Sequence, residues 1–183
     1  MTDKILEMIK QVEFSNNSSK LLHKNPTEDG LTYFGIYETA HPDWYGWNII
    51  KRYLVNTPDL KECSKILANV SDLNYQVKQF YKKEFFDKMK LGQVNNEDKQ
   101  LEVMCLAINI GIRPAVKVLQ KVLNVEVDGI IGKQTIDALN NFNDDLFDKL
   151  FDEAEIKYYD SLIENKPKFE IYRKGWHNRA NLI

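Results

Sequence analysis

The sequence predicts a mainly α-helical protein with at most a small β-hairpin. Ile5, Met8, Ile9 and Val12 recur at steps of three and four residues, which is the pattern of one face of an amphipathic helix. Further apolar runs of helical length follow, whereas residues 32–37 contain β-branched and aromatic side chains, which favour a strand. At 183 residues the chain can bury a core as one domain, or as one domain with a small appendage.

The same signals order the elements along the chain. A turn-rich loop over residues 16–30 follows the first helix, and residues 32–37 can form a strand or hairpin arm. Later helices are expected over residues 48–54, 60–70, 75–89, 101–110, 114–123, 133–139 and 146–162. We expect Asn96 to cap the helix that includes 101–110 and Gly111 to end it, because these residue types favour those positions.

Composition excludes several classes of function. The formal net charge of −2 gives no argument for nucleic acid, and the chain has no phosphate loop or dinucleotide fingerprint. Cys63 and Cys105 lack metal or redox spacing, so both are expected in the core. His23, His41 and His177 share no ligand spacing, and we therefore expect no metal or other cofactor.

Glu13 stands out among the 27 acidic residues. It follows Ile5 and Ile9 at successive steps of four, so it lies at the edge of the apolar stripe where the helix ends. We expect a carboxyl group there to be partly removed from water, which favours its protonated form and suits a glycosidic general acid. Asp29 and Thr32 in the following segment are candidates for positioning water. The alternative is that Glu13 is an ordinary acidic residue at a helix end.

Aromatic and turn residues allow a functional and a structural interpretation. Tyr33 and Trp44 could offer flat faces to sugar rings, but large aromatic side chains also build cores, and both interpretations stay open. Trp47 is expected in the core. Asp128, in a Gly-containing turn, is expected to accept hydrogen bonds from nearby backbone amides.

Ordered blocks along the chain resemble the glycoside hydrolase family 108 lysozymes. The blocks are Glu13 with Thr32 and Phe34-Gly35-Ile36, then Asn109-Ile110-Gly111 with Leu119-Gln120, then Asp128-Gly129, Gly132 and Thr135, and finally Gly175-Trp176 with Asn178-Arg179. Phe14-Ser15 departs from the Gly-Gly that follows the catalytic Glu in the family.

The resemblance implies a lysozyme-like catalytic region over residues 1–110. A peptidoglycan-binding-like helical segment over 111–183 would pack onto it as one compact unit. The implied activity is that of a muramidase, which hydrolyses the β-1,4 bond between N-acetylmuramic acid and N-acetylglucosamine. Glu13 matches the catalytic acid.

The remaining site residues are placed with less direct matches. Asp29 and Thr32 are assigned as further catalytic groups, and Tyr33, Trp44 and Asn109 as substrate-binding residues. Peptidoglycan glycan strands are the expected partner of a monomeric protein. A lytic transglycosylase on the same fold, or a non-catalytic wall-binding protein, are the alternatives.

The start of the chain gives an expectation about location. Residues 1–10 lack the apolar core of a signal peptide, and no stretch approaches the roughly 18 apolar residues that a membrane span needs. The resembled family is frequent among phage and prophage endolysins. We therefore expect synthesis in the host bacterial cytoplasm without membrane insertion, and action on the wall in the periplasm after release through a separate holin-type pore.

Overall fold

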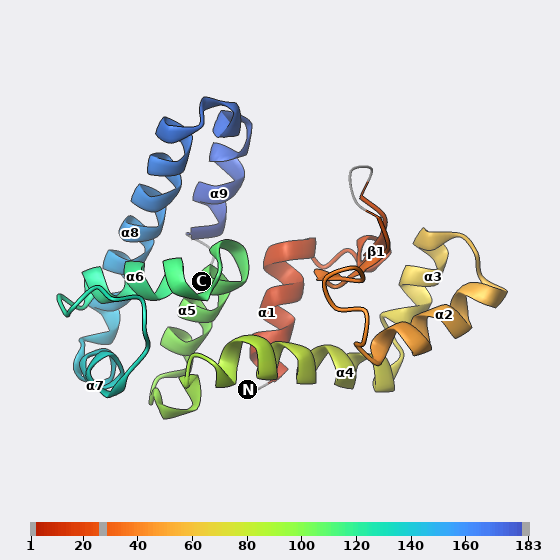
Figure 1. Cartoon of the computed structure of the whole chain (residues 1–183), viewed down its shortest axis with the longest axis horizontal. Helices are drawn as coiled ribbons and strands as arrows, with labels where there is room; N and C mark the ends of the chain where they lie inside the picture. The colour runs from red at the N-terminus through yellow and green to blue at the C-terminus, as the bar shows by residue number, and fades with distance from the viewer. Residues whose placement is uncertain (1–2, 26–28, 181–183) are drawn as a thin grey trace. The chain divides into compact units, whose positions relative to one another are not determined.

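The computed structural model describes residues 3–25 and 29–180, without the side chains of residues 3, 5, 6, 12 and 13. Its internal contacts divide the chain into two compact units, which we call the N-terminal unit (residues 2–82) and the C-terminal unit (residues 83–183). Helices dominate both units (Figure 1), which confirms the mainly α class. Among the described residues, no helix is both long enough and apolar enough to cross a membrane.

The N-terminal unit combines helices with a small sheet. Its elements are α1 (Asp3–Phe14), the 3₁₀ turn η1 (Ser18–Lys20), β1 (Leu22–His23), β2 (Thr32–Tyr33), β3 (Ile36–Tyr37), α2 (Gly46–Asn56), α3 (Leu60–Leu67) and α4 (Ser71–Tyr81). The first helix lies where the apolar periodicity predicts it. Ile9 is 1% exposed and the terminal Phe14 is 8% exposed, so this face of α1 is buried.

The sheet is antiparallel in the order β1-β2-β3, with Thr32 opposite both His23 and Tyr37. The turn between β2 and β3 has only two residues, Phe34 and Gly35, and both have positive φ, at 52° and 78°. Positive φ at both central positions characterises the two-residue hairpin turn that matches strand twist. The stretch expected to be one strand or hairpin arm over 32–37 is thus a complete small hairpin, with its turn at Phe34-Gly35.

The C-terminal unit is helical. Its elements are the π-helical turn η2 (Lys82–Asp87, whose first residue still belongs to the other unit), η3 (Leu91–Gln93), α5 (Glu97–Ile110), α6 (Ile112–Val122), α7 (Lys133–Asn141), α8 (Asp144–Asn165), η4 (Pro167–Tyr172) and α9 (Arg173–Ala180). Figure 1 shows α8 and α9 side by side, and α8 also packs on α5 and α6. Phe147 and Phe151 on α8 stack at 5.1 Å between ring centroids in the core.

The predicted N-terminal cap and C-terminal end of α5 are confirmed. The Asn96 side chain accepts hydrogen bonds from the amides of Asp98 and Lys99, and Gly111 ends the helix with φ 87°. Both cysteines are buried, as expected of small core residues.

Three features differ from the sequence expectation. The loop 16–30 contains η1 and β1, the helix expected over 75–89 ends as α4 at Tyr81 and continues as a π turn, and the tail forms η4 and α9. The break after the π turn falls at Lys90, whose φ is 53°.

Candidate functional site

The C-terminal end of α1 packs against the β2–β3 turn. The rings of Phe14 and Phe34 lie 5.2 Å apart, and the Phe34 amide donates to the Leu21 carbonyl at 2.8 Å. The Tyr81 hydroxyl donates to the Phe34 carbonyl at 2.7 Å. Gly35 is required beside this bond, because a Cβ there would lie 2.9 Å from the Tyr81 oxygen. The Phe-Gly-Ile segment is therefore a rigid support for the end of α1.

Glu13 is the residue before Phe14, so its backbone belongs to the last turn of α1 beside this hairpin. Its side chain lies outside the described part of the structure. The described groups nearest to the end of α1 are those of the β2–β3 hairpin and the segment that leads into it.

Asp29 lies at the entrance to the hairpin with its side chain exposed. Its backbone carbonyl accepts hydrogen bonds from the Tyr37 hydroxyl at 2.7 Å and from the Thr39 hydroxyl. Two residues on, the Leu31 amide donates to Glu38 Oε2 at 3.1 Å, and Lys51 pairs with Glu38 Oε1 at 2.8 Å. This Lys51 hydrogen bond is the main cause that lowers the pKa of Glu38 below its usual value. The segment that carries Asp29 is thus fixed through its backbone, which leaves the carboxylate facing solvent.

Thr32, on the central strand, is 6% exposed. Within the described part of the chain its hydroxyl oxygen is buried and has no hydrogen-bond partner. A buried hydroxyl without a partner costs free energy, and such a cost is often kept where a group has a functional role.

The two aromatic candidates differ in exposure. Tyr33 is 0% exposed, and burial, with a smaller contribution from Cys63, raises its pKa far above the usual value. A ring without exposed surface offers no face to a sugar in this conformation, so the core interpretation describes Tyr33. Trp44 is half-buried and stacks on Tyr33 at 6.5 Å with an interplanar angle of 20°. Its indole nitrogen donates to the Gln76 carbonyl at 3.4 Å, and the rings of Trp47 and Phe80 also pack on it, so Trp44 is part of an aromatic cluster that is only partly exposed.

Asn109 belongs to the C-terminal unit, near the end of α5. Its amide nitrogen donates to the Cys105 carbonyl at 3.0 Å, and its oxygen accepts from Arg179 at 2.6 Å. Trp176, three residues before Arg179, stacks on Tyr159 at 4.9 Å. Asn109 thus makes hydrogen bonds to Cys105 and Arg179 within the C-terminal unit, and its assignment as a substrate contact stays a prediction.

A pocket of about 520 Å³ opens on the N-terminal unit at the end of α1. Its walls combine apolar side chains, Phe14, Leu22 and Leu60, with polar and basic ones, Ser19, Lys20, His23, Lys24 and Lys61. Among the predicted site residues whose side chains the structure describes, none lines this pocket. A pocket of this character suits a ligand with an apolar face and negatively charged groups.

Sequence inspection missed these basic residues because they lie on separate elements. Lys20 and Lys24 flank β1, whereas Lys61 comes from the first turn of α3, some forty residues later.

The Gln120-Asp128-Gly129-Thr135 block forms one hydrogen-bonded network in the C-terminal unit. Gln120, 1% exposed on α6, donates to Asp128 Oδ1 at 2.7 Å, to the Ile130 carbonyl at 3.1 Å and to Thr135 Oγ1 at 3.3 Å. Its own oxygen accepts from the Gly129 amide at 2.8 Å.

Asp128 has the capping role that the sequence predicted. Its Oδ1 also accepts from the Ile130 amide at 2.8 Å, and this bond is the first cause that lowers the pKa of Asp128. Gly129 has φ 76°, and a Cβ there would lie 2.8 Å from the Arg113 side chain. The block therefore organises the loop between α6 and α7.

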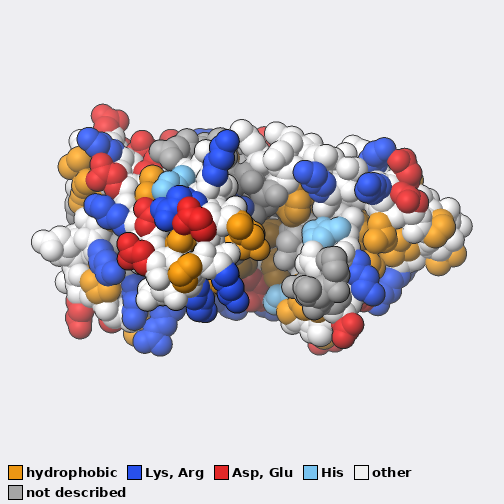
Figure 2. Space-filling model, turned by 90° about the horizontal axis from the view of Figure 1, so that it is seen from above, with side chains coloured by type: hydrophobic (Ala, Val, Ile, Leu, Met, Phe, Trp, Pro, Cys, Tyr) orange, Lys and Arg blue, Asp and Glu red, His pale blue; other side chains and the backbone are white. Residues whose placement is uncertain are grey.

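A groove of about 490 Å³ runs between α6 and α8 of the same unit. It is lined by Val118, Lys121, Val122, Leu150, Glu153, Ala154, Lys157, Tyr158 and Ser161. Burial raises the pKa of the half-buried Tyr158, so its neutral hydroxyl can donate in the groove. Figure 2 shows acidic and basic side chains interspersed over the visible face of the molecule, in keeping with the small net charge.

Two family models match consecutive parts of the chain. Residues 22–111 match the glycosyl hydrolase 108 model, and residues 114–181 match a model described as a predicted peptidoglycan domain. The first range begins at β1, so it includes Asp29, Thr32 and Trp44 and leaves α1 outside.

The fold has a counterpart among solved structures. The structure of Brucella abortus SagA superposes with a TM-score of 0.61 over 97% of this chain and 90% of that chain, at 20% sequence identity. At this identity the likeness concerns the fold. A comparison with curated proteins gives no match. From the two family models, the chain carries a glycosyl hydrolase 108 domain, which marks it as a glycoside hydrolase, followed by a predicted peptidoglycan domain.

Proposed function

We propose that this protein is a peptidoglycan muramidase. The observation that supports this most directly is that one chain carries both a glycosyl hydrolase 108 domain and a predicted peptidoglycan domain. The bond cut would be the β-1,4 linkage from N-acetylmuramic acid to N-acetylglucosamine.

Glu13 is the proposed general acid. It donates its proton to the glycosidic oxygen as the bond to C1 of the muramic acid breaks, and an oxocarbenium-like centre develops at C1. Rigid packing of Phe14 on Phe34 supports this role, because it holds the last turn of α1 in place. The half-buried Trp44 is a candidate platform for a sugar ring.

The water that completes the reaction needs a second group. The exposed Asp29 carboxylate could take the proton of a water that attacks C1 from the opposite face, which inverts the configuration. The unpartnered Thr32 hydroxyl could orient that water instead. A third route retains the configuration, with a nearby carboxylate stabilising the intermediate before water adds.

Replacement of Glu13 by Gln tests the acid. The variant keeps the size of the side chain but has no proton to donate, so lysis of permeabilised Gram-negative cells should fall about 10²–10⁴-fold. Glu7→Gln is the matched control, because Glu7 is exposed on the same helix. Parent-like lysis by the Glu13 variant would refute the assignment.

Thr32→Val removes the hydroxyl but keeps the shape of the side chain, so it tests the role of the hydroxyl without disturbing the fold. Because the hydroxyl makes no hydrogen bond within the described structure, valine should leave the thermal stability unchanged or higher. A drop in lysis at full stability would support a role in orienting water, and full activity would assign water to another group such as Asp29.

Mass analysis of the released fragments distinguishes the chemical alternatives. A muramidase leaves a reducing N-acetylmuramic acid, whereas a lytic transglycosylase closes a 1,6-anhydro ring and its product is lighter by one water. Binding to peptidoglycan without any fragments would favour a non-catalytic wall-binding protein.

Peptidoglycan binding is the proposed role of the C-terminal domain, and the groove between α6 and α8 is the proposed contact surface. Its aliphatic walls and the Tyr158 hydroxyl could hold a sugar or a stem peptide.

An endolysin role is the remaining part of the proposal. Under it, cells that make the protein in their cytoplasm stay intact until a separate membrane pore opens. Expression with and without a co-expressed holin, followed by optical density, tests this role.

A further inference from the structure

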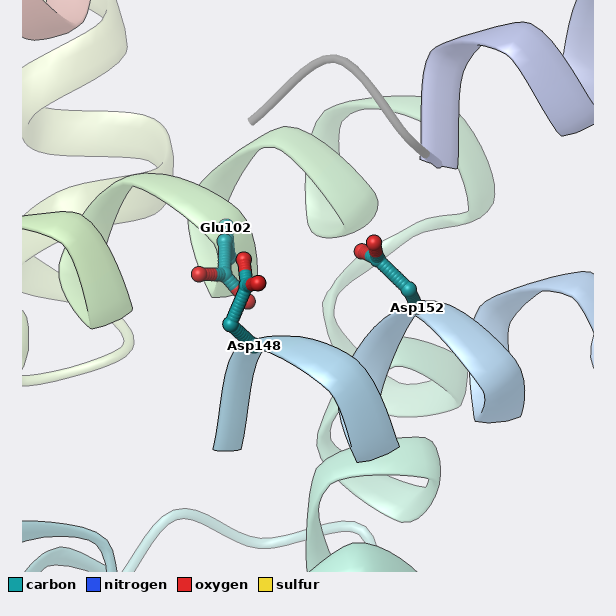
Figure 3. Close-up of side chains that lie close together, drawn as sticks. All are labelled: Glu102, Asp148 and Asp152. Carbon is teal, nitrogen blue, oxygen red and sulfur yellow. The ribbon is translucent and has the colours of Figure 1, made fainter. Parts of the chain in front are cut away.

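Three carboxyl groups meet in the C-terminal unit where α5 packs on α8. Glu102 comes from α5, and Asp148 and Asp152 come from successive turns of α8 (Figure 3). One carboxylate oxygen of each residue lies within 4.8 Å of those of the other two. Asp148 is exposed, Asp152 is half-buried and Glu102 is buried, so the cluster opens to solvent on one side.

Glu102 is the unusual member of this cluster. It is 5% exposed, and its Oε2 atom is buried with no hydrogen-bond partner within the described residues. Figure 3 shows its carboxyl group turned toward Asp148. An ionised carboxylate in such a place is unfavourable unless something positive joins it.

The nearby basic side chain does not supply that charge. Lys99, three residues before Glu102, donates to the carbonyls of Leu139 and Phe142 and pairs with Asp144 at 2.6 Å. Burial, followed by the negative charges of Asp148 and Asp152, raises the pKa of Glu102 to about 8.

The chemistry of the three carboxyl groups defines which metal ion the cluster would bind. All the donors are carboxylate oxygens, which favour a hard cation over zinc, whose usual ligands are nitrogen and sulfur. Calcium binds oxygen at about 2.3–2.6 Å, so ligands on opposite sides of the ion lie roughly 4.6–5.2 Å apart. One oxygen of each of the three residues lies within 4.8 Å of the others, which is close enough for all three to reach one such ion. Water can complete the coordination from the side of Asp148.

We propose that Glu102, Asp148 and Asp152 bind a calcium ion that joins α5 to α8. The ion would neutralise the buried carboxylate and hold the two helices together. This site is independent of the proposed glycosidase reaction, because its residues and its readouts are separate from those of Glu13.

Calorimetric titration of the full-length, EDTA-stripped protein with CaCl₂ at pH 7.5 tests the proposal. We expect one site per chain with a Kd of about 0.1–1 mM, the range of weak extracellular calcium modules. At 10 mM CaCl₂ the unfolding equilibrium constant should fall about 10–100-fold, measured as a rise in Tm of several degrees.

Substitutions in the carboxylate cluster test whether calcium binds there. Glu102→Gln and Asp152→Asn should each weaken calcium binding at least tenfold and remove most of the rise in Tm. Asp145→Asn, at an exposed position near the start of α8, should respond to calcium like the parent protein.

Three outcomes would overturn the proposal. The first is the absence of binding heat and of any Tm change in the parent protein up to 10 mM CaCl₂, which needs no variant to fold. The second is an equal calcium response in the Glu102→Gln and Asp152→Asn double variant. The third is an equal rise in Tm with KCl at matched ionic strength, which would assign the effect to screening.

Discussion

Replacement of Gln120 by Met should destabilise the C-terminal unit strongly, although it changes the side-chain volume little. Gln120 is 1% exposed and joins Asp128, Gly129, Ile130 and Thr135 through its amide. A net hydrogen bond contributes about 0.5–1.5 kcal/mol, and more to a charged partner such as Asp128. Water can replace part of this at the exposed loop, which leaves an expected cost of about 2–4 kcal/mol.

Urea unfolding followed by circular dichroism measures this cost. With a slope of about 2 kcal/mol per molar urea, in the middle of the usual range, the midpoint should fall by roughly 1–2 M. Gln134→Met is the matched control, because Gln134 is exposed on α7 and its replacement should cost less than 0.5 kcal/mol.

Amide hydrogen exchange tests the local reasoning. The Gly129 amide donates to Gln120 Oε1, so it should exchange at least tenfold faster in the variant than in the parent protein. A cost below 1 kcal/mol together with unchanged exchange at Gly129 would show that the network does not hold this loop.

Three further predictions concern the two units. Gly46→Ala should lower the free energy of unfolding by about 1–3 kcal/mol, because the new methyl would lie 2.3 Å from the Trp44 ring; an unchanged Tm and near-ultraviolet spectrum would contradict it. Burial raises the pKa of Glu155 from 4.5 to about 7, so between these pH values the folded state binds more protons than the unfolded state. The free energy of unfolding should therefore fall as the pH rises from about 4.5 to 7, by at most about 1.4 kcal/mol per pH unit. Glu155→Gln should reduce that loss in thermal scans with EDTA, and an identical pH profile would count against it. Tyr158→Ala in the α6–α8 groove should weaken sedimentation with purified peptidoglycan several-fold at unchanged helix content, whereas Tyr75→Ala, at an exposed position in the other unit, should not.

Much of the fold could be predicted from residues that are close together in the sequence. The apolar spacing of α1, the Asn96 cap and the positive-φ Gly111 depend on residues within a few positions of one another. The capping role of Asp128 belongs to the same class. Such features are visible in a sequence because helix and turn preferences act over short distances.

Elements that depend on distant partners were missed. β1 has only two residues, and it is a strand because Leu22 and His23 pair with β2. The Leu22 amide donates to Ser64, 42 positions later, and no local signal announces that bond. The tail helix α9 is similar, since Arg179 reaches Asn109 across 70 positions.

The sequence by itself determined the helical class, the order of most elements, the hairpin and the family-like blocks, because these follow from periodicity, turn chemistry and motif order. Only the tertiary structure decided that Tyr33 is core, that Asn109 bonds to Arg179 and that Glu102 meets the acidic face of α8. The physical reason is that burial and carboxylate proximity are properties of packed surfaces. They arise when helices some forty to fifty residues apart in the chain come into contact, and only then does an ordinary glutamate become a buried charge.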